Sequence, residues 1–220
     1  MKINTLEFIS ADFFMKNENP ELDAMPLVTV SQVHGSDILV VDDKHYSFTE
    51  RPKADGILLK TGRAAAALRF ADCAPVMIWP KSDNHSDYRW VMILHSGYKG
   101  TVLNISGKGV ELSGSKSKNL CAWVGPCIGF DDYMRDFSND EWTQRGLQTF
   151  HEANYRISGG KVHFDLAGEI KAQLLEAGLS NENITLSGIN TFRDNRCFSY
   201  RRGDVKERMT LYVTITESPS

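Results

Sequence analysis

The stretch VMIWPKSDNHSDYRWVMIL, residues 76–94, contains two short, wholly apolar runs separated by a polar segment. The runs at residues 76–79 and 90–94 are as short as strands and lack the alternation of a half-exposed strand. Continuous apolar runs of this length are typical of strands buried on both faces of a sheet. We therefore predict two buried strands joined by a loop at residues 81–89.

Other strand patterns precede and follow this pair. Residues 27–33 alternate apolar and polar side chains, and His34-Gly35-Ser36 breaks the pattern before a second apolar run. Glycine beside polar residues is typical of the end of a strand, because glycine readily adopts the backbone conformations of turns. We therefore predict strands at residues 27–33 and 38–41. Two later apolar runs predict further strands at residues 184–189 and 209–215.

A hairpin is predicted in the middle of this first half. Two apolar runs, residues 56–59 and 64–70, flank Lys60-Thr61-Gly62-Arg63, which has the composition of a tight turn. The four alanines at 64–67 would also suit a helix.

Helices are predicted mainly in the second half. The tetrapeptide Ser138-Asn139-Asp140-Glu141 reads as a capping box, with Ser138 as N-cap, and opens a helix that runs to about Phe150. Asp165 caps a second helix, which Gly178 ends. The pattern is α/β of the α+β kind, in a single domain spanning residues 1–220.

The amino-acid composition and charge limit the classes of protein to which this chain can belong. The chain has 220 residues, and 25 Lys and Arg against 28 Asp and Glu give a net charge of −3, which argues against coating nucleic acid or an anionic membrane. No stretch approaches the roughly 20 apolar residues of a membrane helix. The polar start gives no signal-peptide pattern, so we expect a soluble, cytoplasmic protein. The sequence says nothing about oligomeric state.

Three residues share a context that suits chemistry. His34, Cys73 and His95 each follow or border an apolar strand beside glycine or another small residue. Two imidazoles and one thiolate suit Zn²⁺, and three protein ligands leave the fourth position open, as in catalytic zinc sites. The alternative is that each is an ordinary hydrogen-bonded or core residue, since spacings of 39 and 22 residues match no compact zinc motif. The remaining histidines have no such context: His45, His85, His151 and His163.

Six short motifs occur in an order that resembles one family. They are QVHG at 32–35, ADC followed by Pro75 at 71–75, HSGYKG at 95–100, GPCIG at 125–129 with Tyr133, FDL at 164–166 and FSYRR at 198–202. Together they resemble the YfiH family, also called the multicopper polyphenol oxidase or laccase-domain family. The resemblance implies layered mixed sheets flanked by helices, with zinc held by His34, Cys73 and His95.

The resemblance also implies an activity. Family members phosphorolyse adenosine, inosine, guanosine and methylthioadenosine to base and ribose-1-phosphate, and they deaminate adenosine. Zinc suits deamination because it activates water. Asp72 would orient a zinc ligand, unless it only caps a turn. Arg201, Arg202 and Lys99 are candidates for binding phosphate, with at least one of the two arginines facing solvent.

The chain departs from the family pattern near these residues. Tyr98 and Lys99 stand where the family has Trp and Arg, and Asn190-Thr191 replaces a Cys-Thr pair. No Arg-x-Gly-Gly segment is evident in residues 1–31. These exchanges leave the predicted zinc ligands intact but put the substrate preference in question.

Three rival functions fit the same residues. A copper-dependent polyphenol oxidase would need more imidazoles than six histidines without a His-x-His pair provide. A Cys–His hydrolase or deamidase would use Cys73 as nucleophile and His95 as base. A catalytically degenerate member would bind a nucleotide or a partner without turnover.

Overall fold

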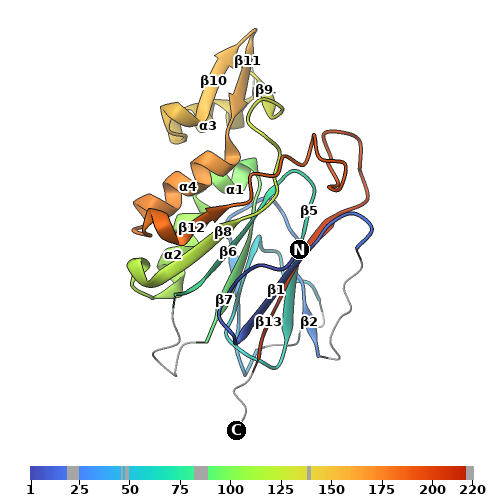
Figure 1. The fold of residues 1–220 in the computed structure, drawn as a ribbon. Coiled ribbons are helices and arrows are strands. Elements are labelled where there is room, and N and C mark those ends of the chain that lie inside the picture. The colour runs from blue at the N-terminus through green and yellow to red at the C-terminus, as the bar shows by residue number, and fades with distance from the viewer. Residues whose placement is uncertain (19–24, 46, 48–49, 82–88, 138–139, 217–220) are drawn as a thin grey trace.

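The computed structural model describes residues 1–18, 25–45, 47, 50–81, 89–137 and 140–216 (Figure 1). Its strands are β1 (Ile9–Phe14), β2 (Leu27–Val28), β3 (Ile38–Val41), β4 (Gly56–Leu59), β5 (Ala65–Phe70), β6 (Ala74–Pro80), β7 (Val91–Ser96), β8 (Leu120–Val124), β9 (Met134–Asp136), β10 (Tyr155–Ser158), β11 (Lys161–Phe164), β12 (Ile184–Leu186) and β13 (Met209–Ile215). Its α-helices are α1 (Tyr98–Val102), α2 (Ile105–Ser113), α3 (Glu141–Thr149) and α4 (Leu166–Glu176). Its 3₁₀ helices are η1 (Ser117–Asn119), η2 (Glu152–Asn154) and η3 (Asn181–Asn183).

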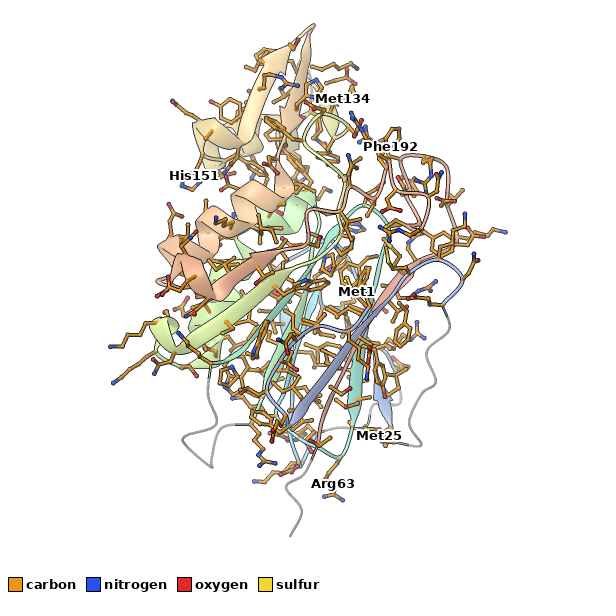
Figure 2. All side chains as sticks on the ribbon, viewed as in Figure 1. Met1, Met25, Arg63, Met134, His151 and Phe192 are labelled. Carbon is orange, nitrogen blue, oxygen red and sulfur yellow. The ribbon has the colours of Figure 1, made fainter. Side chains whose placement is uncertain are left out.

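Two mixed sheets pack face to face. One has six strands in the order β12-β8-β6-β7-β4-β3, and the other has four in the order β1-β13-β5-β2. Apolar side chains of both sheets form one buried cluster between them, including Phe13, Phe70, Met77 and Ile93. Figure 2 shows the side chains that fill the interior of the molecule. This sandwich is the main core of the protein.

Helices cover the other face of the six-stranded sheet. Val76 and Met92 of the sheet pack with Ile105 of α2 and with Ile170 of α4 in a second buried cluster. Successive side chains of a strand point to opposite faces, so β6 and β7 are buried on both sides. The prediction of two doubly buried strands in residues 76–94 is confirmed, and residues 82–88 of the loop between them lie outside the described part of the chain.

A smaller sheet projects from one end of the sandwich (Figure 1). It has the order β10-β11-β9 and packs, with α3, against Tyr98 and Val102 of α1 through Phe150 and Phe164. None of the described helices is long and apolar enough to cross a membrane.

The predicted hairpin at residues 56–70 is wrong. β4 and β5 are both strands, but β4 pairs with β3 and β7, whereas β5 pairs with β2 and β13. The turn between them therefore carries the chain from one sheet of the sandwich to the other. The alternative of a helix at residues 64–67 is also wrong, because residues 65–67 belong to β5, a strand of the four-stranded sheet, where their side chains are buried.

Other boundaries also differ from the predictions. The strand predicted at residues 27–33 is regular only over Leu27–Val28, and that at 184–189 only over Ile184–Leu186. Glu141, predicted as the third residue of a helix capped by Ser138, is the first residue of α3, because Asp140 is the N-cap and accepts a hydrogen bond from the Trp142 N–H. The predicted cap, Ser138, lies outside the described residues. Asp165 does cap α4, and Gly178 follows its end with a φ of +95°.

The sequence patterns do not predict the α2 helix. The α2 sequence, ISGKGVELS, contains two glycines, which weaken helix propensity. A Cβ on Gly109 would lie 2.7 Å from the Met92 sulfur. The glycine therefore allows α2 to lie close against the sheet, and this packing outweighs the poor local propensity.

Candidate functional site

His34 lies in an irregular segment between β2 and β3. Its φ of +59° is in the left-handed region, which residues other than glycine adopt rarely. Three consecutive N–H groups, of Val33, His34 and Gly35, donate to the carboxylate of Asp55 at 3.1, 2.9 and 2.6 Å. This one carboxylate therefore fixes the turn that presents His34.

Cys73 and His95 come together through the pairing of β6 and β7. His95 lies opposite Pro75 in this antiparallel pair, and Cys73 directly precedes β6. Asp72 has a φ of +78°, so the chain turns sharply just before Cys73 as it leaves β5. The cysteine is thus held at the end of a doubly buried strand, beside the histidine of the next strand.

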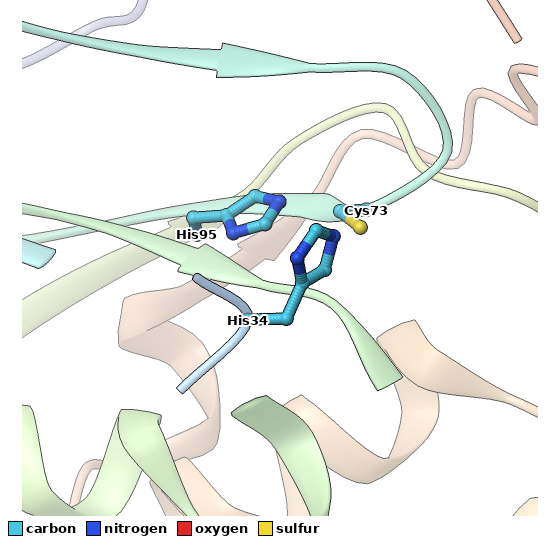
Figure 3. Close-up of side chains that lie close together, drawn as sticks. All are labelled: His34, Cys73 and His95. Carbon is cyan, nitrogen blue, oxygen red and sulfur yellow. The ribbon is translucent and has the colours of Figure 1, made fainter. Parts of the chain in front are cut away.

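The three predicted ligands converge. One side-chain atom each of His34, Cys73 and His95 lies within 4.8 Å of the other two (Figure 3). The two imidazole ring centres are 4.9 Å apart, and the rings are nearly perpendicular. Segments far apart in sequence therefore supply one compact group of two nitrogens and a sulfur.

This group can hold a metal ion. Zinc binds His nitrogen at about 2.0–2.1 Å and Cys sulfur at about 2.3 Å, so its ligand atoms lie roughly 3.3–3.8 Å apart. The donor types fit zinc, and ligand atoms that lie within 4.8 Å of one another would move closer together around a bound ion. Gly97 makes room beside the group, because a Cβ there would lie 2.6 Å from the Cys73 sulfur.

Asp55 also binds one of the three residues directly. Its fully buried carboxylate lies 2.8 Å from Nδ1 of His95. A carboxylate partner makes Nδ1 the N–H donor, which leaves Nε2 as the lone-pair nitrogen of the ring. Sequence reasoning missed Asp55, although it precedes the apolar run at 56–59 and stands beside a glycine, the same context that singled out the other three.

Cys73 and His95 favour each other's charged forms. Burial opposes ionisation of the Cys73 thiol, but the charge of His95 and hydrogen bonds from His34 and His95 outweigh burial and lower the thiol pKa. Burial likewise opposes protonation of His95, but the Cys73 thiolate and the hydrogen bond to Asp55 outweigh it and raise the imidazole pKa. The thiolate is the form of cysteine that binds metals or attacks electrophiles.

Asp72 lies in the same region but has different partners from those expected. Its carboxylate accepts hydrogen bonds from the Thr191 hydroxyl and from the backbone N–H of Arg201, both at 2.7 Å. The carboxylate that orients a predicted metal ligand is therefore Asp55, and Asp72 instead fixes the loop that carries Arg201.

A cavity of about 780 Å³ opens at this group. That volume lies within the range of about 300–1,000 Å³ found for small-molecule sites. Besides His34, Cys73 and His95, six cationic side chains line it: Arg51, Arg69, Lys99, Arg135, Arg201 and Arg208.

Two predicted phosphate-binding residues line this cavity. The Arg201 guanidinium lies 5.2 Å from the Tyr133 ring centre and donates one hydrogen bond, of 3.1 Å, to the Met134 carbonyl. The Lys99 ammonium lies 4.8 Å from the Trp142 ring centre. Both stack on aromatic rings, which holds their charges at the cavity wall.

Arg202 does not line the cavity. Its guanidinium donates to the carbonyls of Thr191, Phe192 and Cys197 and pairs with Asp204 at 3.0 Å. At least one of the two adjacent arginines was expected to face solvent, and Arg201 is exposed, whereas Arg202 is half-buried and bonded to the loop backbone. Its N–H donors bind the backbone of the loop and Asp204, so they do not face the cavity in which phosphate was expected to bind.

Known proteins resemble this chain over most of its length. A purine nucleoside phosphorylase of Rickettsia conorii is 29% identical over 163 residues, which are 72% of this chain and 63% of that protein. The chain thus spans a little less than two thirds of that relative. The purine nucleoside phosphorylase YfiH of Shigella flexneri is 26% identical over 190 residues, covering 84% and 72% of the two chains.

The fold is shared with a solved structure. The hypothetical protein YfiH of Bacillus licheniformis superposes with a TM-score of 0.81 over 94% of this chain and 93% of that one, at 24% identity. The expectation of layered mixed sheets flanked by helices is confirmed by this likeness and by the two packed sheets described above. The family described as multi-copper polyphenol oxidoreductase laccase matches residues 15–216. With that match and the YfiH-named relatives, this chain belongs to the YfiH family of laccase-like domains.

Proposed function

We propose that the protein is a zinc-dependent purine nucleoside phosphorylase. Its substrates would be adenosine, inosine, guanosine and methylthioadenosine with orthophosphate, and it would also deaminate adenosine. The observation that carries the proposal is the convergence of His34, Cys73 and His95 at the wall of a cavity lined by cations. The names of the relatives give the reaction class.

His34, Cys73 and His95 would hold the zinc ion. Bound there, zinc would supply a Lewis acid with one coordination position left for a ligand from the cavity. Asp55 would keep the His95 ring in the orientation that turns Nε2 toward the ion, since it holds Nδ1. It would also keep the His34 turn closed through three backbone N–H groups.

Lys99 and Arg201 would bind orthophosphate. In phosphorolysis a phosphate oxygen forms a bond to C1′ of the ribose as the bond from C1′ to the base nitrogen breaks, and the base leaves with the electron pair and takes up a proton. The two cations hold the attacking anion and offset its charge. Asp72 would act on this step indirectly, because it anchors the Arg201 backbone.

Chromatography of adenosine incubated with metal-quantified protein tests the proposal. Adenine formed only when phosphate is present, with about one zinc per chain, is the expected result for phosphorolysis. Inosine formed with or without phosphate is the expected sign of deamination. Bound zinc without either product would reject both activities and favour a member that binds a nucleotide without turnover.

A second candidate function is favoured by one feature of the same group. Asp55, His95 and Cys73 lie in the order orienting acid, base and nucleophile, which is the arrangement of thiol hydrolases and deamidases. Zinc would occupy the thiolate and protect it from alkylation. Rapid labelling of Cys73 by iodoacetamide without a chelator would support this candidate, and labelling only after chelation would support the zinc site.

Copper oxidation has weaker support. Within the described part of the chain, one group of three side chains is arranged to hold a metal, and a multicopper oxidase needs several imidazole-rich sites. A colourless protein that contains zinc is the expected result. A blue protein with a thiolate-to-copper absorption band would reverse this judgement.

We also propose that the protein acts in the cytoplasm. All four cysteines are free thiols, as is usual in a reducing compartment.

A further inference from the structure

Two cations of the cavity have no part in the function proposed above. Arg51 and Arg69 line the same cavity as His34, Cys73 and His95, and both are exposed. Among residues 1–18, 25–45, 47, 50–81, 89–137 and 140–216, neither guanidinium has a hydrogen bond or an acidic partner. Unpaired guanidinium groups facing a cavity are suited to binding an anion, because their forked donors match phosphate oxygens.

The backbone of both arginines is attached to the segment that leads to His34. The Gln32 side chain makes two hydrogen bonds to the backbone of Arg69 in β5. Its Nε2 donates to the Arg69 carbonyl at 2.8 Å, and its Oε1 accepts from the Arg69 N–H at 2.9 Å. One residue earlier, the Ser31 N–H donates to the carbonyl of Pro52, the residue after Arg51, at 2.8 Å. These bonds fix where the two arginine side chains begin relative to the predicted zinc ligand.

No carboxylate in the cavity neutralises the two charges. Asp72 is the one acidic residue among the described residues that line it, and its two oxygens already accept bonds from Thr191 and from the Arg201 N–H. Two other lining arginines are held elsewhere: Arg135 pairs with Asp140, and Arg208 donates to backbone carbonyls. The uncompensated positive charge therefore belongs to Arg51 and Arg69 and, separately, to Lys99 and Arg201.

These two pairs come from different parts of the fold. Lys99 lies on α1 and Arg201 lies in the loop before β13, against the aromatic rings of Trp142 and Tyr133. Arg51 and Arg69 lie beside the Ser31–Gln32 segment. Because one orthophosphate is used in each turnover, it needs only one of the two pairs. The other pair is then available to a second anionic group, such as a phosphate ester on the nucleoside.

We propose that Arg51 and Arg69 form a second anion subsite, which binds the 5′-phosphate of a purine nucleoside 5′-monophosphate. This inference rests on the proposed function for the binding of the purine nucleoside. It widens the ligand class from nucleosides to their phosphate esters.

Calorimetric titration with adenosine 5′-monophosphate and with adenosine tests the subsite. The zinc-quantified protein is titrated in phosphate-free buffer at low ionic strength, where no phosphorolysis takes place. The monophosphate is expected to bind at least about tenfold more tightly, the order given by one charge-assisted hydrogen bond, and salt should reduce the difference. Arg69→Gln and Arg51→Gln should each remove most of the difference and leave adenosine binding unchanged.

Lys118→Gln is the matched control. It removes one positive charge at an exposed position of η1 that does not line the cavity, so the affinities for both ligands should stay as in the wild type.

Three results would overturn the subsite. One is equal affinity of the wild type for the two ligands, or no binding of either. The second is that Arg69→Gln weakens adenosine as much as its monophosphate. The third is that Arg69→Gln raises the KM for inorganic phosphate in inosine phosphorolysis, because Arg69 would then belong to the orthophosphate site. Monophosphate binding that depends on Arg69, in a protein that releases no base, would keep the subsite and reject the phosphorylase.

Discussion

Asp55 is the residue whose replacement should reveal most about the site. Its carboxylate accepts four hydrogen bonds, three from the backbone around His34 and one from Nδ1 of His95. Alanine would remove both acceptor oxygens, and with them all four hydrogen bonds, at a fully buried position. The two shortest bonds, at 2.6 and 2.8 Å, correspond to about 1.5–3 kcal/mol each because the acceptor is charged. Their loss alone would cost about 3–6 kcal/mol, close to the total stability of many domains.

Asp55→Asn is therefore the better test, because it keeps the shape of the side chain. An amide has one acceptor oxygen, and its NH₂ would face N–H donors where the second carboxylate oxygen was. Half of the four bonds are kept at most, and at about 1.5–3 kcal/mol for each bond to a charged acceptor the loss of the other two predicts a fall of about 3–6 kcal/mol in the free energy of unfolding, half of the fall expected for alanine, which loses all four. Because the His95 and His34 positions loosen together, zinc affinity should fall about 10–100-fold.

Competition with a chromogenic chelator measures the zinc affinity of the folded variant, and urea unfolding measures its stability. The control is Asp132→Asn: this carboxylate accepts from Asn190 and from the Arg193 side chain and does not line the cavity. The control should lose some stability and keep its zinc affinity. An Asp55→Asn protein that binds zinc as tightly as the wild type would refute the positioning role, whatever its stability.

Three further predictions follow from other contacts. Gly97→Ala should lower the zinc content of purified protein, since its Cβ would lie 2.6 Å from the Cys73 sulfur; full zinc content would show that the turn can shift. Arg201→Ala should raise the KM for phosphate far more than it changes adenosine deamination, and equal losses in both reactions would remove Arg201 from the phosphate site. Hydrogen bonds to two glutamates, that to Glu169 being the stronger, raise the pKa of His151. A raised pKa in the folded state means that this stabilisation is complete below about pH 6.5 and is lost as the pH rises through the folded pKa. The thermal midpoint should therefore fall slightly over that interval, and His151→Gln should abolish that part of the pH dependence; because His151 is partly exposed, the effect is small.

Sequence patterns predicted those strands and helices that are marked by residues within the element itself or at its ends. The doubly buried strands β6 and β7 show as apolar runs, and Asp165 and Gly178 mark the ends of α4 by the chemistry of caps. The three residues that converge were singled out because strand ends beside glycine can expose a reactive side chain, and the resemblance to the YfiH family then favoured them as zinc ligands over ordinary core or surface residues.

Pairings across the molecule could not be predicted in this way. The turn at residues 60–63 has the same local composition whether its strands pair with each other or enter different sheets, and here β4 and β5 enter different sheets. Asp55 was missed for a related reason. Its role depends on contacts with His34 and His95, 21 and 40 residues away in the chain, which no local pattern contains.

The exchange of Trp and Arg for Tyr98 and Lys99 has two separate consequences in the structure. Tyr98 is buried, its hydroxyl donates to the Trp142 carbonyl at 2.9 Å, and a Cβ on Gly146 would lie 1.9 Å from that hydroxyl. The smaller aromatic ring and the glycine of α3 are thus matched to each other, so this exchange concerns packing, at a residue that also lines the cavity. Lys99 is exposed and lines the cavity, where an ammonium gives a point charge in place of a fork of donors. A change in phosphate or substrate preference should therefore be sought at Lys99, and Lys99→Arg is the substitution that would restore the side chain implied by the resemblance to the family while it leaves Tyr98 and its contact with Gly146 in place.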